Sequence, residues 1–505
     1  MTEPAALRLV ALDMGAESGR AVVGSFDGGR LSISDVHRFP NTPVPMAGTL
    51  HWDFPRLFGD VLTGLRRAGV DGPVASVGAD TWGVDFGFLD ARGRLLANPV
   101  HYRDARTHGM VEAAAEVVPL AEIYQTTGIQ FMHINTLYQL LAMARAHDPL
   151  LGQADRLLMT GDLFAHFLGG VSVAEYTLAT TSQCLDARSR DWARPLMERL
   201  GIPTAFFPEV VEPGTVLGPL RPDVAADTGL SGTRVVASGS HDTACAVVGT
   251  PLSGPSTAFL SSGTWSLLGL EMPAPVIDER SRAANLTNEG GVAGTIRLLR
   301  NVTGLWLVQE VRRSLWPPEE APSYEALSAL AEAAPAFTAF IDPDEPGFMD
   351  PGDMPARVRT FCEETGQPVP GDPGVLVRVL LESLALKYAQ VIGVLSQVAG
   401  RSIGSIHAVG GGVNNRLLCQ LTADATGLPV RAGPVEATAI GNLLVQIIAD
   451  GGLRDLQEAR ELVRSAVPVR RFEPTSEARG SSDAFGRFGE VMARFDLNPR
   501  GADTK

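Results

Sequence analysis

The chain has 505 residues, more than a single hydrophobic core normally serves, so we expect at least two domains. Hydrophobic residues make up 45% of it and charged residues 20%, which excludes a wholly disordered protein. The formal net charge of −15 argues against nucleic acid and anionic membranes as partners, since both are recognised through basic groups.

The cysteines and the apolar stretches indicate the cellular compartment of the protein. Four cysteines are too few to stabilise a chain of this length by disulfide bonds, so they favour a reducing compartment. They lie far apart, without the spacing typical of a metal site, at Cys184, Cys245, Cys362 and Cys419. The opening MTEPAALRLVALD lacks the pattern of a signal peptide, and no apolar stretch is long enough to span a membrane. We expect a soluble, cytoplasmic protein.

The first elements predict a three-strand meander. Residues 7–13 (LRLVALD) have the pattern of a buried strand, which enters a small polar loop at residues 14–20 (MGAESGR). Residues 21–26 predict the second strand. Residues 27–29 (DGG) are typical of a hairpin turn, because these residue types tolerate positive φ. Residues 31–39 complete the meander.

The rest of the first half alternates strands with helices. Residues 74–80 (VASVGAD) predict a strand that ends in the loop TWGVDF, and a turn follows at residues 90–93. Residues 135–147 predict a helix with Asn135 as its cap. This alternation favours a mostly parallel sheet, with ligands at the loops that leave the strands.

The opening arrangement returns near the middle of the chain. A strand at residues 256–261 (STAFLS) leads through the loop SGT to a strand at residues 265–271 (WSLLGLE). This repeat indicates two related α/β halves, and the turn-rich residues 250–256 mark their boundary. The predicted organisation is a first domain at 1–249, a second at 250–475, and a polar, frayed tail at 476–505.

The second half continues the alternation. Its predicted elements are a hairpin at 285–301, a helix at about 302–315, a long helix from 375, a strand at 405–409, a helix beginning near Asn414 or Asn415, a short strand at 428–433 and a helix at 436–450.

The first loop that carries chemistry runs from Asp13 to Arg20. An acidic residue at a strand end suits Mg²⁺, usually through water, and Arg20 would supply positive charge for a terminal phosphate. The glycines would let backbone N–H groups approach phosphate oxygens. An ordinary turn is the alternative, because short glycine patterns are common.

The second such loop is GSHDT, which follows a predicted strand and precedes a helix. Asp242 there can accept the proton of an attacking hydroxyl, as a kinase requires. The alternative is that Asp242 caps the helix, a common position for aspartate. The two roles do not exclude each other.

The third loop is a run of glycines, Gly410 to Gly412, between a strand and a helix. It would allow a nucleotide to lie against bare backbone near a helix N-terminus, although a tight turn would also explain it. The P-loop pattern and the dinucleotide fingerprint are absent from the sequence. Ser261, Ser262 and Ser266 have no paired histidine with nucleophile-elbow spacing, so serine hydrolysis has little support.

With these loops in place, the chain resembles the FGGY family of carbohydrate kinases, in the actin/hexokinase/Hsp70-type ATPase superfamily. The resemblance extends from about residue 8 to 445 and is closest to members that phosphorylate L-rhamnulose. It is carried by ALDMGAESGR, GADTWGVDF, PVHYRDARTHG, GIQFMHINTLYQL, ASGSHDTACAV, FLSSGTWSLLG, NLTNEGG, NVTGLWLVQ, VGGGVNNRLLCQLTADATG and AGPVEATAIGN.

This resemblance implies an α/β fold of two RNase H-like domains with the active site in the cleft between them. It implies transfer of the γ-phosphoryl group of MgATP to O1 of L-rhamnulose, with Asp242 as proton acceptor and Asp13 organising Mg²⁺. The implied sugar-binding residues are Gly83, His241, Asp242, Thr243 and Asn301. The implied ATP-binding residues are Ala16, Glu17, Ser18, Gly19, Arg20, Thr264, Gln309 and Gly411.

The phosphate loop departs from the wider family at two positions. Ala16 stands where threonine is usual, and Glu17 puts a carboxylate where serine is often found. Side-chain hydroxyl contacts are therefore lost there, so backbone N–H groups and Arg20 must do more.

Other functions stay open at the level of sequence. The acceptor could be another small ketose or polyol such as L-fuculose or L-xylulose, because a few polar contacts tune a sugar pocket. An actin- or Hsp70-like ATPase is a less favoured alternative, since such a protein needs no base aimed at a sugar hydroxyl. A sugar-binding regulator on a kinase fold is weaker still. The oligomeric state could be monomer or dimer.

Overall fold

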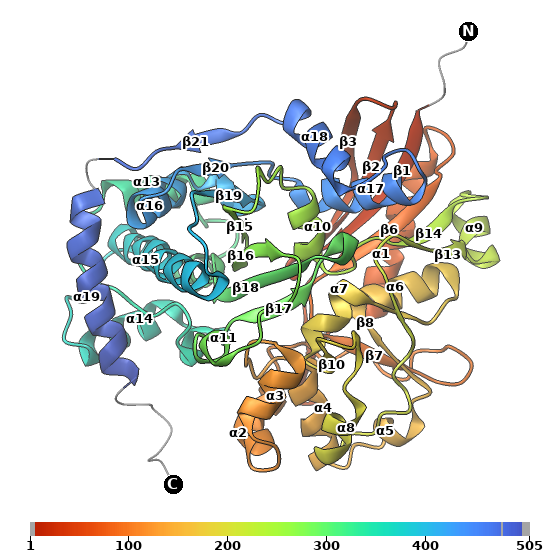
Figure 1. Cartoon of the computed structure of the whole chain (residues 1–505), viewed down its shortest axis with the longest axis horizontal. Helices are drawn as coiled ribbons and strands as arrows, with labels where there is room; N and C mark the ends of the chain where they lie inside the picture. The colour runs from red at the N-terminus through yellow and green to blue at the C-terminus, as the bar shows by residue number, and fades with distance from the viewer. Residues whose placement is uncertain (1–5, 476–477, 497–505) are drawn as a thin grey trace. The chain divides into compact units, whose positions relative to one another are not determined.

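The structure is a computed structural model that describes residues 6–475 and 478–496. The chain divides into two compact units, neither of which is continuous in sequence (Figure 1). The first unit comprises Met1–Pro251, Glu271–Leu299 and Glu436–Val467, and the second comprises Leu252–Leu270, Arg300–Val435 and Pro468–Lys505. The first junction falls within the turn-rich segment 250–256, but two later segments return to the first unit.

The main sheet of the first unit has the strand order β13-β14-β6-β1-β2-β3. Its strands are β1 (Leu7–Met14), β2 (Ser18–Phe26), β3 (Leu31–Pro40), β6 (Ser76–Thr81), β13 (Thr215–Pro219) and β14 (Arg234–Ala237). The predicted meander is confirmed: β1, β2 and β3 pair antiparallel, and the Asp27 side chain accepts from the N–H groups of Gly29 and Arg30 at the turn.

The sheet is mixed, so the expectation of a mostly parallel sheet is wrong. Strand β6 pairs parallel with both β1 and β14, but the meander and the β13–β14 pair are antiparallel. The alternation of strands and helices predicts the parallel centre only. The meander adds antiparallel strands at one edge, and β13 runs antiparallel to β14 at the other.

Two faces of this sheet are covered by helices. Successive side chains of β2 point to opposite faces of the sheet. Val22 packs into the core that includes α17 (Ala437–Ala449), whereas Ala21 lies on the other face, against Gly64 of α1 (Phe54–Gly69). In Figure 1, α17 lies beside β1 and β2. The other helices of the unit are α2 (Met110–Ala115), α3 (Leu120–Thr127), α4 (Thr136–Arg145), α5 (Leu150–Gln153), α6 (Thr160–Gly169), α7 (Tyr176–Ala179), α8 (Arg194–Arg199), α9 (Pro222–Thr228), α10 (Asp242–Val248), α11 (Glu279–Ala283) and α18 (Leu456–Ala466).

Helices α10 and α17 approach each other closely through glycines. A Cβ atom at Gly441 would lie 1.8 Å from the Cys245 carbonyl oxygen, and one at Gly249 would lie 2.1 Å from that of Ala437. Only glycine fits at such distances, so the two backbones meet directly. The packing fixes α10, whose first residue is Asp242.

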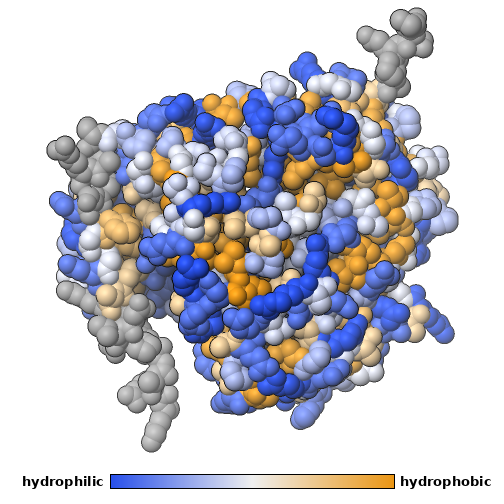
Figure 2. All heavy atoms as spheres, in the orientation of Figure 1, coloured by the Kyte–Doolittle hydropathy of each residue, from blue (hydrophilic) through white to orange (hydrophobic). Residues whose placement is uncertain are grey.

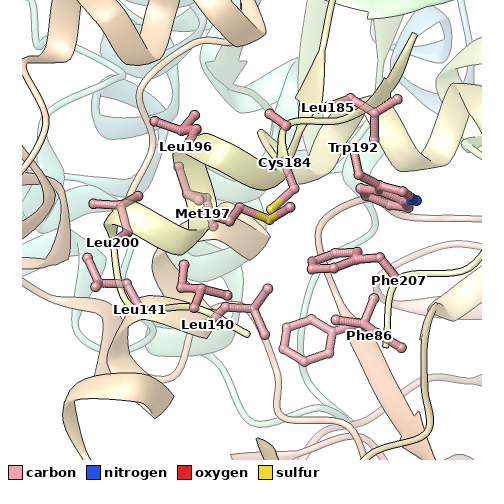
Figure 3. Packing of buried hydrophobic residues seen from close by; sticks show 14 of the residues in the cluster. Phe86, Leu140, Leu141, Cys184, Leu185, Trp192, Leu196, Met197, Leu200 and Phe207 are labelled. Carbon is pink, nitrogen blue, oxygen red and sulfur yellow. The ribbon is translucent and has the colours of Figure 1, made fainter. Parts of the chain in front are cut away.

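A separate buried cluster supports the loop after β6 (Figure 3). It includes Phe86, Leu140, Leu141, Cys184, Leu185, Trp192, Leu196, Met197, Leu200 and Phe207. The predicted helix is confirmed as α4, which begins after Asn135; the Asn135 side chain makes no cap bond. Thr136 of α4 instead donates to the Val84 carbonyl oxygen at 2.6 Å, which ties the core to the loop.

Short pairs of strands complete the first unit. They are β4 (Val44–Met46) with β5 (Thr49–His51), β7 (Phe86–Leu89) with β8 (Arg156–Met159), β9 (Ala174–Glu175) with β12 (Val210–Val211), and β10 (Leu185–Asp186) with β11 (Asp191–Trp192). A last pair, β17 (Thr287–Gly290) with β18 (Ile296–Thr303), forms one edge of a seven-stranded sheet. The last pair confirms the predicted hairpin, and β18 runs on into the second unit.

The second unit repeats the opening of the first. Strand β15 (Thr257–Ser262) pairs antiparallel with β16 (Trp265–Met272) and parallel with β19 (Ser405–Val409), as β1 does with β2 and β6. Strand β20 (Val430–Ala432) lies between β19 and the edge strand β21 (Arg470–Phe472). The helices are α12 (Trp306–Leu315), α13 (Tyr324–Ala333), α14 (Met354–Glu364), α15 (Pro373–Ala399), α16 (Arg416–Thr426) and α19 (Ala478–Asp496). The predicted pair of related halves is confirmed at this level.

Two sequence expectations fail in the second unit. Helix α12 begins at Trp306 rather than near 302, because β18 continues through Thr303. The tail is not frayed between 478 and 496, where α19 buries Phe488, Val491 and Met492. Residues 476, 477 and 497–505 of the predicted tail lie outside the described residues.

The face of the molecule in Figure 2 carries hydrophilic residues interspersed with hydrophobic ones. Within residues 6–475 and 478–496, no helix combines the length and the apolar character needed to cross a membrane.

Candidate functional site

Two aspartates lie side by side at the ends of β1 and β6. Asp13 and Asp80 are direct partners in the parallel register of these strands. Asp80 is fully buried, and its Oδ2 accepts a 2.5 Å hydrogen bond from Asn442. Its Oδ1 has no hydrogen-bond partner among the described residues. Burial raises the pKa of Asp80 well above its usual value, and the neighbouring charge of Asp13 adds to this. Two carboxyl groups side by side favour a bound cation, because a cation would stabilise their ionised forms.

Arg20 supplies a positive charge that pairs with Asp13. It faces Asp13 across β1 and β2, and its Nε and Nη2 donate to Asp13 Oδ2 at 2.9 and 2.7 Å. Its Nη1 pairs with Glu436. Burial disfavours the guanidinium charge, but Asp13 and Glu436 together raise the pKa of Arg20. Its Nη1 also lies 3.8 Å from Asp35 Oδ1, so three carboxylates of the first unit surround Arg20.

The phosphate loop is shorter than the sequence predicts. Strand β1 extends to Met14 and β2 begins at Ser18, so Ser18, Gly19 and Arg20 lie in a strand. Gly19 is explained by packing, because a Cβ there would lie 2.4 Å from the Phe39 ring. The loop proper contains Ala16 and Glu17. It is closed by a hydrogen bond from the N–H of Gly15 to the Ser18 carbonyl oxygen at 3.0 Å.

The donors at the strand ends fit Mg²⁺. No group of three or more His, Cys, Asp or Glu side chains that could hold a metal occurs in the described part of the chain. Mg²⁺ does not require one, since it is commonly bound by one or two carboxylates, water and substrate phosphates. Asp13, with the unsatisfied Oδ1 of Asp80 beside it, supplies oxygen donors of this kind.

Asp242 is the first residue of α10, and it does not cap the helix. The N-cap is His241, which makes no side-chain cap bond. The Asp242 side chain keeps 30% of its surface exposed, and its Oδ1 accepts from the Thr243 hydroxyl at 3.1 Å. Burial raises the pKa of Asp242, His241 lowers it, and Asp13 raises it further. A partly exposed carboxylate with a raised pKa is suited to accept a proton.

The loop before Asp242 is held by a buried carboxylate. Glu175 Oε2 accepts from the Ser240 N–H at 2.9 Å and from the Thr177 hydroxyl at 2.6 Å. The Ser240 carbonyl oxygen in turn accepts from the N–H of Thr81, at the end of β6. The loop is therefore fixed to the sheet from both sides, and this places Asp242 independently of any cap.

The loop that contains Gly83 is rigid. Asp85 is fully buried, and it accepts from the indole N–H groups of Trp52 at 2.6 Å and Trp82 at 3.0 Å. Burial raises the pKa of Asp85 to about 6. A Cβ at Gly83 would lie 3.0 Å from the Thr181 hydroxyl oxygen, so close packing also explains why this residue is glycine.

The predicted ATP-binding residues of the second unit cluster around β15 and β16. Gln309 of α12 lies with its Nε2 3.4 Å from the Thr264 hydroxyl, and the N–H of Trp306 donates to the Thr264 carbonyl oxygen. Asn301, the predicted sugar ligand, lies on β18.

The glycines from Gly410 to Gly412 differ in how closely the protein packs against them. A Cβ at Gly410 would lie 2.8 Å from the Ser262 carbonyl oxygen, and one at Gly412 would lie 2.0 Å from the Ser262 hydroxyl. A Cβ at Gly411 would meet nothing within 4 Å. The protein itself therefore requires glycine at 410 and 412 but not at 411, where bare backbone borders open space.

Family models match both halves of this chain. The N-terminal domain model of the FGGY family of carbohydrate kinases matches residues 8–249, and the C-terminal domain model matches residues 258–449. The chain belongs to the FGGY family. It is therefore a carbohydrate kinase, a phosphotransferase that acts on a sugar, and the family uses ATP.

Curated FGGY relatives cover nearly the whole chain. A rhamnulokinase of Bacteroides thetaiotaomicron is 42% identical over 93% of this chain and 96% of its own length. A rhamnulokinase of Enterococcus faecalis is 41% identical over 92% and 94%. Among solved structures, a gluconate kinase from Lactobacillus acidophilus matches with a TM-score of 0.82 at 18% identity, covering 98% of this chain and 99% of that one. The structural likeness shows the fold, a two-domain mixed α/β kinase fold.

Several residues of the candidate site escaped the sequence reasoning. They are Asp80, Glu175, Glu289, Arg297, Glu436 and Asn442. Asp80 carried a signal, since it ends a predicted strand just as Asp13 does. Glu289, Glu436 and Asn442 stand in the motifs NLTNEGG and AGPVEATAIGN, but no role was assigned to them. Glu175 and Arg297 gave no signal, because their contacts are with residues far away in the sequence.

Proposed function

We propose that this chain transfers the γ-phosphoryl group of MgATP to O1 of L-rhamnulose, giving L-rhamnulose 1-phosphate and ADP. The choice of substrate is supported by the rhamnulokinase relatives at 42% and 41% identity over almost the full chain. The observation that carries the chemistry is Asp242, a partly exposed carboxylate with a raised pKa at the start of a fixed helix.

In the proposed mechanism Asp242 accepts the proton of the C1 hydroxyl while the sugar oxygen attacks the γ-phosphorus. The bond to the β-phosphate oxygen breaks, and ADP leaves with its electron pair. Mg²⁺ would be held near Asp13 and would neutralise charge on the phosphate oxygens. Arg20 would orient Asp13 and add positive charge, and backbone N–H groups of Ala16 and Glu17 would bind phosphate.

The remaining residues have binding roles in this proposal. Gly83, His241, Thr243 and Asn301 would contact the sugar, while Ser18, Gly19, Thr264, Gln309 and Gly411 would contact ATP. Residues 1–249, with the segments 271–299 and 436–467 of the same unit, would form the sugar-binding and phosphate-loop domain. The rest of residues 250–475 would form the nucleotide-binding domain, with 476–505 as a tail that contains α19. The cytoplasm is the proposed compartment, and the described cysteines, all free and buried, suit its reducing conditions.

A kinase for another ketose remains the second candidate. L-fuculose and L-xylulose differ from L-rhamnulose at few positions, and a small number of polar contacts sets such a preference. An actin- or Hsp70-like ATPase is disfavoured by membership of a carbohydrate kinase family.

A coupled ADP-release assay across a panel of ketoses and polyols tests the proposal. We expect the highest kcat/KM with L-rhamnulose and a product whose phosphorus couples to the C1 protons in NMR. A preference for L-fuculose, L-xylulose or glycerol would contradict the substrate. ATP turnover independent of any acceptor would contradict the kinase mechanism.

A further inference from the structure

Two buried charged side chains of the β17–β18 hairpin contact the imidazole of His241. Glu289 and Arg297 are direct partners in the antiparallel register of the hairpin. The Arg297 side chain is 0% exposed, and that of Glu289 is 5% exposed. Arg297 Nη1 lies 3.2 Å from Glu289 Oε2. Burying an ion pair costs desolvation and often adds no net stability, so stability alone does not explain an ion pair at this place, beside His241.

The hydrogen bonds of Arg297 determine which nitrogen of His241 carries the proton. Arg297 Nε donates to the Gly290 carbonyl oxygen at 2.9 Å, and Nη2 lies 3.0 Å from His241 Nδ1. A guanidinium can only donate. Nδ1 must therefore accept, which leaves the proton of a neutral imidazole on Nε2. Glu289 Oε2, 3.4 Å from Nδ1, is the competing partner, but a proton on Nδ1 would point into the guanidinium.

The protonated Nε2 faces the catalytic carboxylate. His241 Nε2 lies 3.4 Å from Asp242 Oδ1. The Thr243 hydroxyl donates to the same oxygen at 3.1 Å. Neither contact involves Oδ2, so Oδ1 is the oriented oxygen and Oδ2 is the one available to a sugar hydroxyl.

We propose that Arg297, paired with Glu289, is a positioning residue that holds His241 as the Nε2–H tautomer, so that His241 orients Asp242 and leaves Oδ2 to take the proton of the sugar. This inference rests on the proposed function for its final step, because that step requires Asp242 to be the base. The tautomer itself is a property of the free protein.

The test removes both charges at once, so that no unpaired charge remains buried. The double variant Arg297→Met/Glu289→Gln is compared with Arg460→Met/Glu271→Gln. The latter removes another pair of the first unit, in which Arg460 donates to both Glu271 oxygens at 2.7 and 2.8 Å. Nitrogen-15 NMR of histidine-labelled full-length protein without ligands reports the tautomer, and His241→Asn assigns the signals.

In the wild type and in the control variant, we expect His241 Nδ1 in the unprotonated range and Nε2 in the protonated range. In the hairpin variant both signals should move toward values averaged over two tautomers. The kcat should fall about 10-fold or more, since orientation of the base is lost, while the change in Tm should match that of the control. The KM for ATP should stay near wild type.

Two outcomes would overturn the proposal. One is a protonated Nδ1 in the wild type, which would mean that Glu289 and not Arg297 sets the tautomer. The other is an unchanged spectrum and an unchanged kcat in the hairpin variant, which would leave the ion pair a structural role. Because the spectrum is recorded without substrate, it decides the tautomer even if the enzyme prefers another ketose.

Discussion

Asp13 and Arg20 face each other across the first two strands, and one carboxylate oxygen of Asp13 receives two hydrogen bonds from the guanidinium. The arginine is therefore oriented before any phosphate arrives. Its Nη1 also lies 3.8 Å from Asp35 Oδ1 and contacts Glu436 at the N-terminus of α17. The second contact connects the phosphate loop to a helix that follows it by more than four hundred positions.

Replacing Arg20 by alanine should lower kcat by roughly 100-fold or more, because both the charge for the phosphate and the orientation of Asp13 are lost. Steady-state kinetics with ATP and L-rhamnulose measure this. Arg66→Ala, which removes an exposed pair with Asp227, is the control and should leave kcat unchanged. An unaltered kcat/KM in folded Arg20→Ala would remove Arg20 from the site.

Asp242→Asn should lower kcat by roughly 10²- to 10⁴-fold, because an amide cannot accept the proton. The KM for ATP and the Tm should stay near wild type, since Asp242 makes no cap bond and asparagine keeps the shape. Asp223→Asn changes an exposed aspartate in the first turn of α9 and should be silent. Wild-type turnover in Asp242→Asn would refute the base, and a loss of activity that follows a collapse in Tm would point to folding.

The acid limb of the pH–rate profile should reflect the raised pKa of Asp242. The base works deprotonated, so kcat/KM should fall as the pH drops through a pKa above 3.8, the ordinary value. A raised carboxylate pKa means that the folded state binds the proton more tightly than the unfolded state, so this protonation itself does not unfold the protein. Kinetics from about pH 4 to pH 9, with circular dichroism at each pH, measure the limb. Activity that stays flat down to pH 4 in folded protein would contradict the assignment.

The glycine run allows a matched pair of variants. Gly411→Ala adds a methyl group where the protein has open space, so its Tm should not change, whereas the KM for ATP should rise if nucleotide lies against this backbone. Gly412→Ala places a methyl group 2.0 Å from the Ser262 hydroxyl and should lower the Tm. Thermal melting and ATP titration of both proteins separate the two effects. An unchanged KM in Gly411→Ala would exclude Gly411 from the nucleotide site.

Asp85→Asn should destabilise the first unit by about 1–3 kcal/mol, because its buried partners Trp52, Trp82 and Gln139 all donate and an amide NH₂ cannot accept from them. Chemical denaturation measures the difference. The pKa of Asp85 is raised to about 6, so the wild type should gain stability as the pH falls through 6, and the variant should lack this gain. Equal stability of the two proteins at pH 7 would contradict the proposed network.

Local patterns predicted much of the fold. The buried strand ending in Asp13, the turn at Asp27 and the helix before His147 follow from periodicity and turn chemistry, which act over a few residues. The motif loops led to the correct family for the same reason, since each is a short run of characteristic residues.

Tertiary contacts explain what could not be predicted. Arg20 lies in a strand because Gly19 packs under Phe39, a contact invisible in the local sequence. The bond from Asn442 to Asp80 and the Arg297–Glu289 pair depend on how distant segments come together. The tail after Thr475 is polar in composition, yet α19 buries Phe488, because a few apolar residues on one face suffice for docking.

Helix α17 belongs to the first unit although it follows most of the second. It covers the sheet face that carries Leu9, Ala11 and Val22. During synthesis, the ribosome must therefore complete nearly all of the second unit before this face receives its helix. The nascent chain exposes an apolar sheet surface throughout that interval, when it is most open to aggregation and to chaperones.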